Sequence, residues 1–126
     1  MNAQELLETY GKAAGVVKSY YVEKFIESMV TENVPENYKE FARSEGIDNS
    51  TIAKMVESMP RALFDVFDSY ELHVEILVMY SDKPSIFTYT VVEGDLIHTQ
   101  PTKYNSRIEA ERVAIEEAFK LLDERL

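Results

Sequence analysis

The segment Leu72-His73-Val74-Glu75-Ile76-Leu77-Val78-Met79-Tyr80 decides the fold class of this chain. Apolar side chains occupy every second position: Leu72, Val74, Ile76, Val78 and Tyr80. A period of two predicts a β-strand with one face on a core. The preceding residues have helical periodicity instead. The change near residue 70 therefore separates a helical part, about 1–68, from a part that begins with strands, about 70–126.

Two more strands are expected after the first. Ser81-Asp82-Lys83-Pro84 has the composition of a turn, and the β-branched and aromatic residues 86–92 predict a second strand. Glu93-Gly94-Asp95 is a hairpin signal, and residues 96–99 return as a short third strand. Together the three segments predict an antiparallel β-meander.

A long amphipathic helix is expected after the meander. Ser106 and Glu109 form a capping box at its start. Its apolar side chains share one arc of a helical wheel, and these are Ile108, Ala110, Ala114, Ile115, Ala118, Phe119, Leu121, Leu122 and Leu126. Because the alanines recur every four residues, this helix can lie close to a sheet, and we expect it to pack on the meander.

The N-terminal part is expected to be helical. Asn2 and Glu5 form a capping box for a long amphipathic helix, in which Gly11 and Gly15 favour a kink or close helix packing. The apolar face of this helix comprises Leu7, Tyr10, Ala14, Val17, Tyr21, Phe25 and Met29. Three shorter helices are expected next, at about 35–43, 51–58 and 61–68. The predicted fold is therefore α+β in one domain, 1–126, with N-terminal helices, a three-stranded antiparallel meander and a C-terminal helix packed on the sheet.

The composition narrows the function. The 126 residues include 13 Lys and Arg against 23 Asp and Glu, for a formal net charge of −10. Nucleic-acid binding depends on cations that displace counterions from phosphates, so nucleic acid is an unlikely partner by charge alone. The chain has no cysteine, which excludes a disulfide, a thiolate metal site and a cysteine nucleophile.

Recognisable signals for chemistry or targeting are lacking in the sequence. Residues 1–7 do not resemble a secretion signal, and no run approaches the ~20 apolar residues that a membrane helix needs. We therefore expect a cytoplasmic protein with no membrane partner. There is no glycine-rich phosphate loop and no nucleophile elbow, so we expect no enzyme and no cofactor, and we assign no catalytic, cofactor-binding or metal residue.

The two histidines, His73 and His98, both lie on predicted strands. One interpretation is that they are solvent-facing sheet residues. The other requires the strands to bring them together near Glu71 or Glu75, which would create a weak metal or acid–base site.

Residues 40–57 resemble the helix-turn-helix of lac-type repressors in their spacing. The resemblance rests on Ala42 where two helices approach, Gly46 in the turn, and Ile47 filling the gap between the helices. Ile52, Met55 and Val56 would anchor the second helix. The resemblance implies that this helix enters the major groove of DNA, with base and phosphate contacts from Asn49, Ser50, Thr51 and Lys54.

A second resemblance covers residues 70–122. The order helix, three strands, helix and the spacing Ser106-Arg107-x-x-Ala110-x-x-x-Ala114-x-x-x-Ala118 are similar to double-stranded-RNA-binding domains. In that family lysines at the start of the last helix grip phosphates, but here Arg107 is the one cation and Ile108 and Glu111 are its neighbours. The tail Tyr104-x-Ser106-Arg107-x-x-Ala110-x-x-x-Ala114-Ile115-x-x-Ala118-Phe119-x-x-Leu122 also resembles the ends of small uncharacterised phage and mobile-element proteins, which implies an origin and no chemistry.

Our leading functional hypothesis is a non-enzymatic protein-interaction or accessory module that binds a protein partner or self-associates. It rests on the excess of acidic over basic residues and on the lack of sequence motifs for catalysis. The alternative is a DNA-binding regulator that uses residues 40–57.

Overall fold

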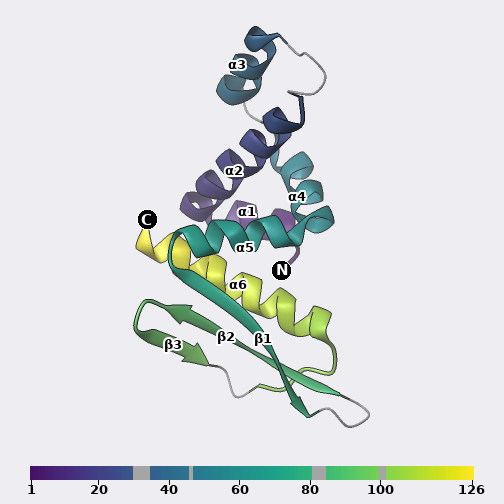
Figure 1. The fold of residues 1–126 in the computed structure, drawn as a ribbon, viewed down its shortest axis with the longest axis vertical. Helices are drawn as coiled ribbons and strands as arrows, with labels where there is room; N and C mark the ends of the chain where they lie inside the picture. Colours follow the sequence, from purple (N-terminus) through teal and green to yellow (C-terminus); the bar gives the residue numbers. More distant parts are fainter. Residues whose placement is uncertain (30–34, 46, 81–84, 100–101) are drawn as a thin grey trace.

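The computed structural model describes residues 1–29, 35–45, 47–80, 85–99 and 102–126 (Figure 1). Within these ranges the elements are α1 (Ala3–Thr9), α2 (Gly11–Met29), α3 (Glu36–Glu45), α4 (Asn49–Ser58), α5 (Pro60–Ser69), β1 (Leu72–Tyr80), β2 (Ile86–Glu93), β3 (Leu96–Thr99) and α6 (Arg107–Arg125). The α+β fold class is confirmed, and the strand bounds match those predicted from the sequence to within one residue, since β2 extends to Glu93. None of the helices in the described ranges combines the length and the apolar character needed to cross a bilayer.

The predicted first helix is broken into α1 and α2 rather than kinked. The capping box at its start is present: the Glu5 N–H donates to Asn2 Oδ1 at 2.8 Å, and the Asn2 N–H donates to Glu5 Oε1 at 3.5 Å. Tyr10 ends α1 with φ −108° and ψ 74°, outside the helical region. Gly11, a weak helix former, is the first residue of α2, so the chain changes direction where a continuous helix is least stable.

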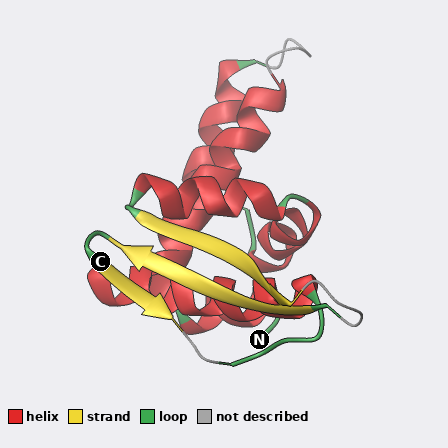
Figure 2. Ribbon diagram, turned by 60° about the horizontal axis from the view of Figure 1, so that its bottom comes forward, coloured by secondary structure: helices red, strands yellow, loops and turns green. Residues whose placement is uncertain are grey.

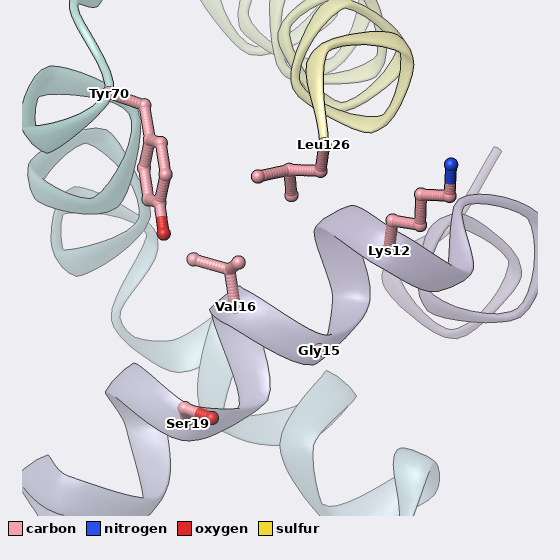
Figure 3. Close-up of a pocket in the computed structure, with 6 residues that line it drawn as sticks. All are labelled: Lys12, Gly15, Val16, Ser19, Tyr70 and Leu126. Atoms are coloured by element: carbon pink, nitrogen blue, oxygen red, sulfur yellow. The ribbon is translucent and has the colours of Figure 1, made fainter.

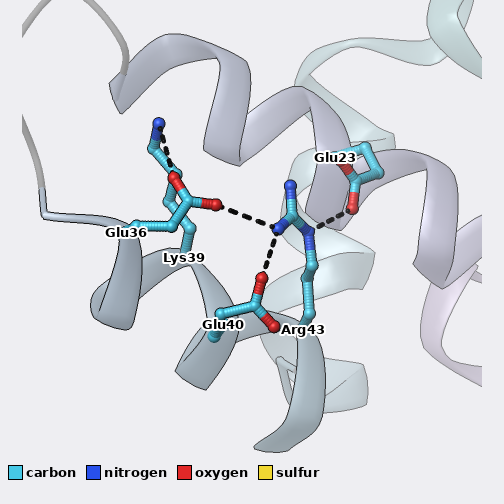
Figure 4. Close-up of polar contacts among 5 residues, drawn as sticks. All are labelled: Glu23, Glu36, Lys39, Glu40 and Arg43. Atoms are coloured by element: carbon cyan, nitrogen blue, oxygen red, sulfur yellow. Dashed lines mark hydrogen bonds and ion pairs between the residues drawn. The ribbon is translucent and has the colours of Figure 1, made fainter.

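The shorter helices confirm the prediction within a few residues. Asp48 caps α4, because its Oδ1 accepts the Thr51 N–H at 2.8 Å. Pro60 opens α5, where its missing N–H costs no helical hydrogen bond. α3 packs against α2, whereas α4 packs against α1, α5 and α2. Arg43 of α3 reaches α2 through Glu23, with Nε 3.0 Å from Oε1 (Figure 4).

The sheet is antiparallel in the order β1-β2-β3. The turn predicted at residues 81–84 lies outside the described residues. The second hairpin pairs Glu93 with Leu96, and Gly94 takes the positive φ of 57° that this tight connection needs. Beyond the end of β3, the chain returns beside β2, where Phe87 and Tyr104 exchange two backbone hydrogen bonds of 2.8 Å each.

α6 lies on one face of the sheet, in contact with β1 and β2, as predicted. Ala110, Ala114 and Ala118 are fully buried there, so the stripe of alanines brings the helix backbone close to the strands. Phe119 extends the contact to α5 by meeting the edge of Phe67, with ring centroids 5.7 Å apart. Figure 2 shows the helices gathered behind the three strands. Among the described residues no helix covers the opposite face.

Candidate interaction site

The two histidines do not converge. His73 pairs with Val92 and His98 with Val91, and these neighbours on β2 point to opposite faces of the sheet. Each histidine has its own local carboxylate: His73 Nδ1 lies 2.9 Å from Asp68 Oδ1, and His98 Nε2 lies 3.4 Å from Glu93 Oε1. In the described ranges, no group of three or more His, Cys, Asp or Glu side chains could hold a metal ion. The two histidines therefore form separate pairs: His73 is exposed, as the first interpretation expects, whereas His98 is half-buried on the sheet face that it shares with the buried Val91.

Glu93 belongs to a contact that fixes the end of α6. Its second oxygen, Oε2, lies 3.5 Å from Nη1 of Arg125. Arg125 also donates a hydrogen bond to the backbone carbonyl of Tyr70, between α5 and β1. The last turn of α6 is thus tied both to the β2–β3 hairpin and to the start of β1, and these charges have a structural role.

The four residues expected to contact DNA are not equally available. Ser50, Thr51 and Lys54 are exposed on α4, but Asn49 is half-buried and its Oδ1 is covered without a hydrogen-bond partner among the described residues. Asp48 precedes them at the start of the helix. The backbone and side chain of Thr51, together with the nearby Lys54, lower the pKa of Asp48, so this position carries a negative charge.

The packing around residues 40–57 also bears on the helix-turn-helix resemblance. Of the residues expected to anchor the second helix, Ile52 and Val56 are buried and Met55 packs against the core. Gly46 and the side chain of Ala42 lie outside the described residues. Figure 1 shows α3 set apart from α4, with α2 as its main neighbour. The DNA contacts stay a prediction.

The start of α6 carries little positive charge. The Arg107 guanidinium lies over the ring of Phe87, 5.5 Å from its centroid, and so has an aromatic partner. Ile108 is 68% exposed and Glu111 is half-buried. The order α5-β1-β2-β3-α6 matches the order expected from the RNA-binding resemblance. The phosphate-gripping cluster of that family has no counterpart in these three side chains.

One hollow lies between α2 and the end of α6. It has a volume of about 630 Å³ and is lined by Lys12, Gly15, Val16, Ser19, Tyr70 and Leu126. Figure 3 shows Val16, Tyr70 and Leu126 pointing toward a common space. Lys12 is the one charged side chain in this lining.

A larger hollow, about 920 Å³, lies where the N-terminal residues, the α4–α5 junction and the first half of α6 meet, and we call it the α1–α6 groove. Figure 1 shows the N terminus between α5 and α6 at this place. Buried or half-buried apolar residues form its floor: Ala3, Leu6, Val56, Pro60, Val113 and Ile115. Met1 and Ile108 add apolar walls that are 50% and 68% exposed. A largely exposed isoleucine beside a buried apolar floor is the arrangement expected of a binding surface.

The rim of the α1–α6 groove is acidic. Five carboxylates line it, and these are Glu5, Glu57, Glu109, Glu111 and Glu116. Two cations accompany them, Arg112 and the amino group of Met1, whose nitrogen lies 3.2 Å from Glu116 Oε2. Among the described residues, Glu57, Glu109 and Glu111 form no ion pair. The groove therefore combines an apolar floor with unneutralised negative charge.

Comparisons of the chain with protein-family models, with curated proteins and with solved structures found no match. The α1–α6 groove is accordingly interpreted from its own geometry.

Sequence reasoning did not identify the groove. It placed Ile108 on the apolar arc of the last helix, but the sheet does not cover this residue. One sequence signal was available: Ile108 follows the Ser106 cap by two residues and precedes the alanine stripe that marks the sheet contact. The remaining lining residues come from distant segments, so only the folded chain reveals that they share a surface.

Proposed function

We propose that the chain is a non-enzymatic protein-interaction or accessory module that binds a protein partner, or a second copy of itself, through the α1–α6 groove. The supporting observation is a groove of about 920 Å³ with an apolar floor and an exposed isoleucine in its wall. Peptide segments dock in such grooves by inserting apolar side chains, and the polar rim sets which sequences fit.

A DNA-binding regulator is the second proposal, favoured by the exposure of Ser50, Thr51 and Lys54 on one helix. The charges around that helix favour the protein-binding proposal instead. Asp48 is ionised at the helix start, and Glu57 is exposed near the helix end. Phosphates approaching either end would meet a carboxylate.

We further propose that the protein works in the cytoplasm. The resemblance of its tail to phage and mobile-element proteins supports an origin in such an element.

Site-specific photo-crosslinking tests the proposed function. A photoreactive residue replaces Ile108 in the groove or, as the control, Lys120, which is exposed on α6 and does not line the groove. In cells that express these variants, we expect the photoreactive residue at position 108 to crosslink to a second protein and the one at position 120 not to crosslink. The adduct is then identified, and the purified partner is titrated against the wild-type chain and Ile108→Glu, which should bind more weakly. A partner that binds both chains equally, or a chain that yields no adduct and stays monomeric by light scattering, would contradict the proposal.

A further inference from the structure

We infer that the occupant of the α1–α6 groove is a cationic amphipathic helix of a protein partner, with its apolar side chains on the floor and Lys or Arg at the rim. This inference rests on the proposed function and narrows it from an unspecified protein, or a second copy, to one class of partner.

The apolar positions of the groove suit a helix that lies along α6. Ile108 and Ile115 are seven residues apart on this helix, which at the usual rise per residue is about 10 Å, or two turns. An amphipathic helix offers apolar side chains at the same interval, i and i+7, with i+3 and i+4 between them. Leu6 and Val56 close the floor from the other side at exposures of 4% and 6%, so this is a fixed apolar surface.

The rim of the groove determines the charge of the partner. Glu57 stands on α4, while Glu109 and Glu111 stand on α6, so carboxylates flank the floor from both sides. None of the three is neutralised by an ion pair in the described residues. Lys or Arg side chains of a bound helix would supply the missing countercharge and would speed association at low salt.

Arg112 limits where those cations can lie. It lines the groove and makes no ion pair among the described residues, so a cation of the partner placed beside it would be repelled. The cations of the partner are therefore expected near Glu57, Glu109 and Glu111, with an apolar or acidic residue opposite Arg112.

The same charges disfavour other occupants. A nucleic acid or an anionic membrane would bring further negative charge to a rim of five carboxylates. A second copy would bring a net charge of −10 to the same place. A basic helix is the occupant that both the floor and the rim attract.

Two matched peptides test this inference, each of roughly 18 residues, or about five helical turns. Both carry Leu at i, i+3, i+4 and i+7; one carries Lys at the remaining positions and the other carries Glu. Binding to the full chain is measured by fluorescence anisotropy at several salt concentrations. We expect the Lys peptide to bind, with an affinity that falls as salt rises, and the Glu peptide not to bind.

Two double variants with the same net charge locate the binding site. Glu57→Lys with Glu111→Lys reverses two rim charges, whereas Glu75→Lys with Glu124→Lys reverses two exposed charges outside the groove. We expect the Glu57→Lys, Glu111→Lys variant to bind the Lys peptide roughly tenfold more weakly, a loss of about 1.4 kcal/mol, because two attractive contacts with the cations of the peptide become repulsive. The Glu75→Lys, Glu124→Lys variant should lose much less affinity for the Lys peptide. Ile108→Ser should weaken binding as well, because it removes an apolar side chain from the wall of the same groove.

The outcomes separate this inference from the proposed function. If both peptides bind and Ile108→Ser weakens both, the groove binds protein without preferring cations, and the inference is wrong while the proposed function stands. Equal weakening by the two double variants would show general attraction to an acidic chain, and it would also overturn the inference. If neither peptide binds, the inference fails, and crosslinking at position 108 then decides the proposed function separately.

Discussion

The carboxylate of Asp123, near the end of α6, accepts a hydrogen bond from the backbone N–H of Lys12 at the start of α2, at 2.9 Å. The same oxygen, Oδ1, accepts the Ala13 N–H at 3.1 Å. The first N–H groups of a helix have no partner within the helix, and a negative charge beside them is stabilising. Asp123 therefore caps a helix that lies 110 residues earlier in the sequence, and it joins the two parts of the fold.

Asp123→Ala should destabilise the fold by about 1 kcal/mol, the usual contribution of a helix cap. Urea unfolding followed by circular dichroism measures the change in the free energy of unfolding. Glu124→Ala is the matched control, since this neighbour is exposed and makes no hydrogen bond to α2 among the described residues, and it should change stability by less than about 0.5 kcal/mol. Equal losses from the two variants would show that Asp123 acts only through the net charge.

Ala114→Leu should cost about 1–3 kcal/mol, because the new side chain has no room between α6 and the strands. Ala114 is fully buried. The control is Lys120→Leu, which places the same side chain on an exposed position of α6. Thermal unfolding compares the two. If Ala114→Leu is as stable as the control, α6 does not lie close to the sheet.

Stability should fall at alkaline pH through two buried tyrosines. Burial, and then nearby Glu117, raise the pKa of Tyr89 to about 12, and burial also raises the pKa of Tyr21. An unfolded tyrosine titrates near pH 10, so the unfolded chain loses these protons first as the pH rises. The free energy of unfolding should therefore be unaffected by these groups below about pH 10 and should decrease from about pH 10 to about pH 12.

Tyr21→Phe checks this pH dependence. The Tyr21 hydroxyl donates to the Met59 carbonyl at 2.8 Å, so the variant should lose about 1 kcal/mol at neutral pH. It should also lose less stability than the wild type on going to alkaline pH. Tyr38→Phe, at a side chain that is 62% exposed, should leave both quantities unchanged. The account would be wrong if the free energy of unfolding fell by the same amount in the two variants between about pH 10 and about pH 12.

Arg43→Ala should loosen α3 without unfolding the rest of the chain. Arg43 pairs with Glu23 on α2 and with Glu36 and Glu40 on α3 (Figure 4), and of these carboxylates Glu23, then Glu40, raise its pKa. Hydrogen exchange should become faster for the amides of α3 and stay unchanged for those of α6, and high salt should produce the same pattern in the wild type. Uniform acceleration across the chain would contradict this local role.

The chain should show no measurable affinity for random duplex DNA at low salt, where counterion release favours binding most. Ser50, Thr51 and Lys54 are exposed, but Asp48 is ionised beside them. Anisotropy with labelled duplex measures this. Salt-dependent binding that Lys54→Ala reduces would favour the DNA-binding regulator over the protein-interaction module.

The strands and most helices could be predicted because their signals are local. Alternation in residues 72–80, the Gly94 hairpin and the caps at Asn2 and Ser106 are each visible within a few residues. A weak point at Gly11 was predicted, but the complete break at Tyr10 was not, because the helix that follows is capped by Asp123 from the far end of the chain.

The candidate site could not be predicted for a similar reason. Met1, Val56 and Ile108 come from three separate segments, and only the packing of α1 and α4 beside α6 brings them together. The separation of His73 and His98 depended on strand register, which the sequence left open. The acid surplus was visible from the start, but its concentration around an apolar floor was not.

The most direct test of the account is to map the binding surface by nuclear magnetic resonance, titrating the Lys peptide into the isotope-labelled full chain. If the α1–α6 groove is the binding site, the amide signals that shift will belong to residues 1–6, 56–60 and 108–116, which surround it. Shifts concentrated instead on residues 49–54 or on the open face of the sheet, or no shifts at all, would contradict the assignment of binding to this groove.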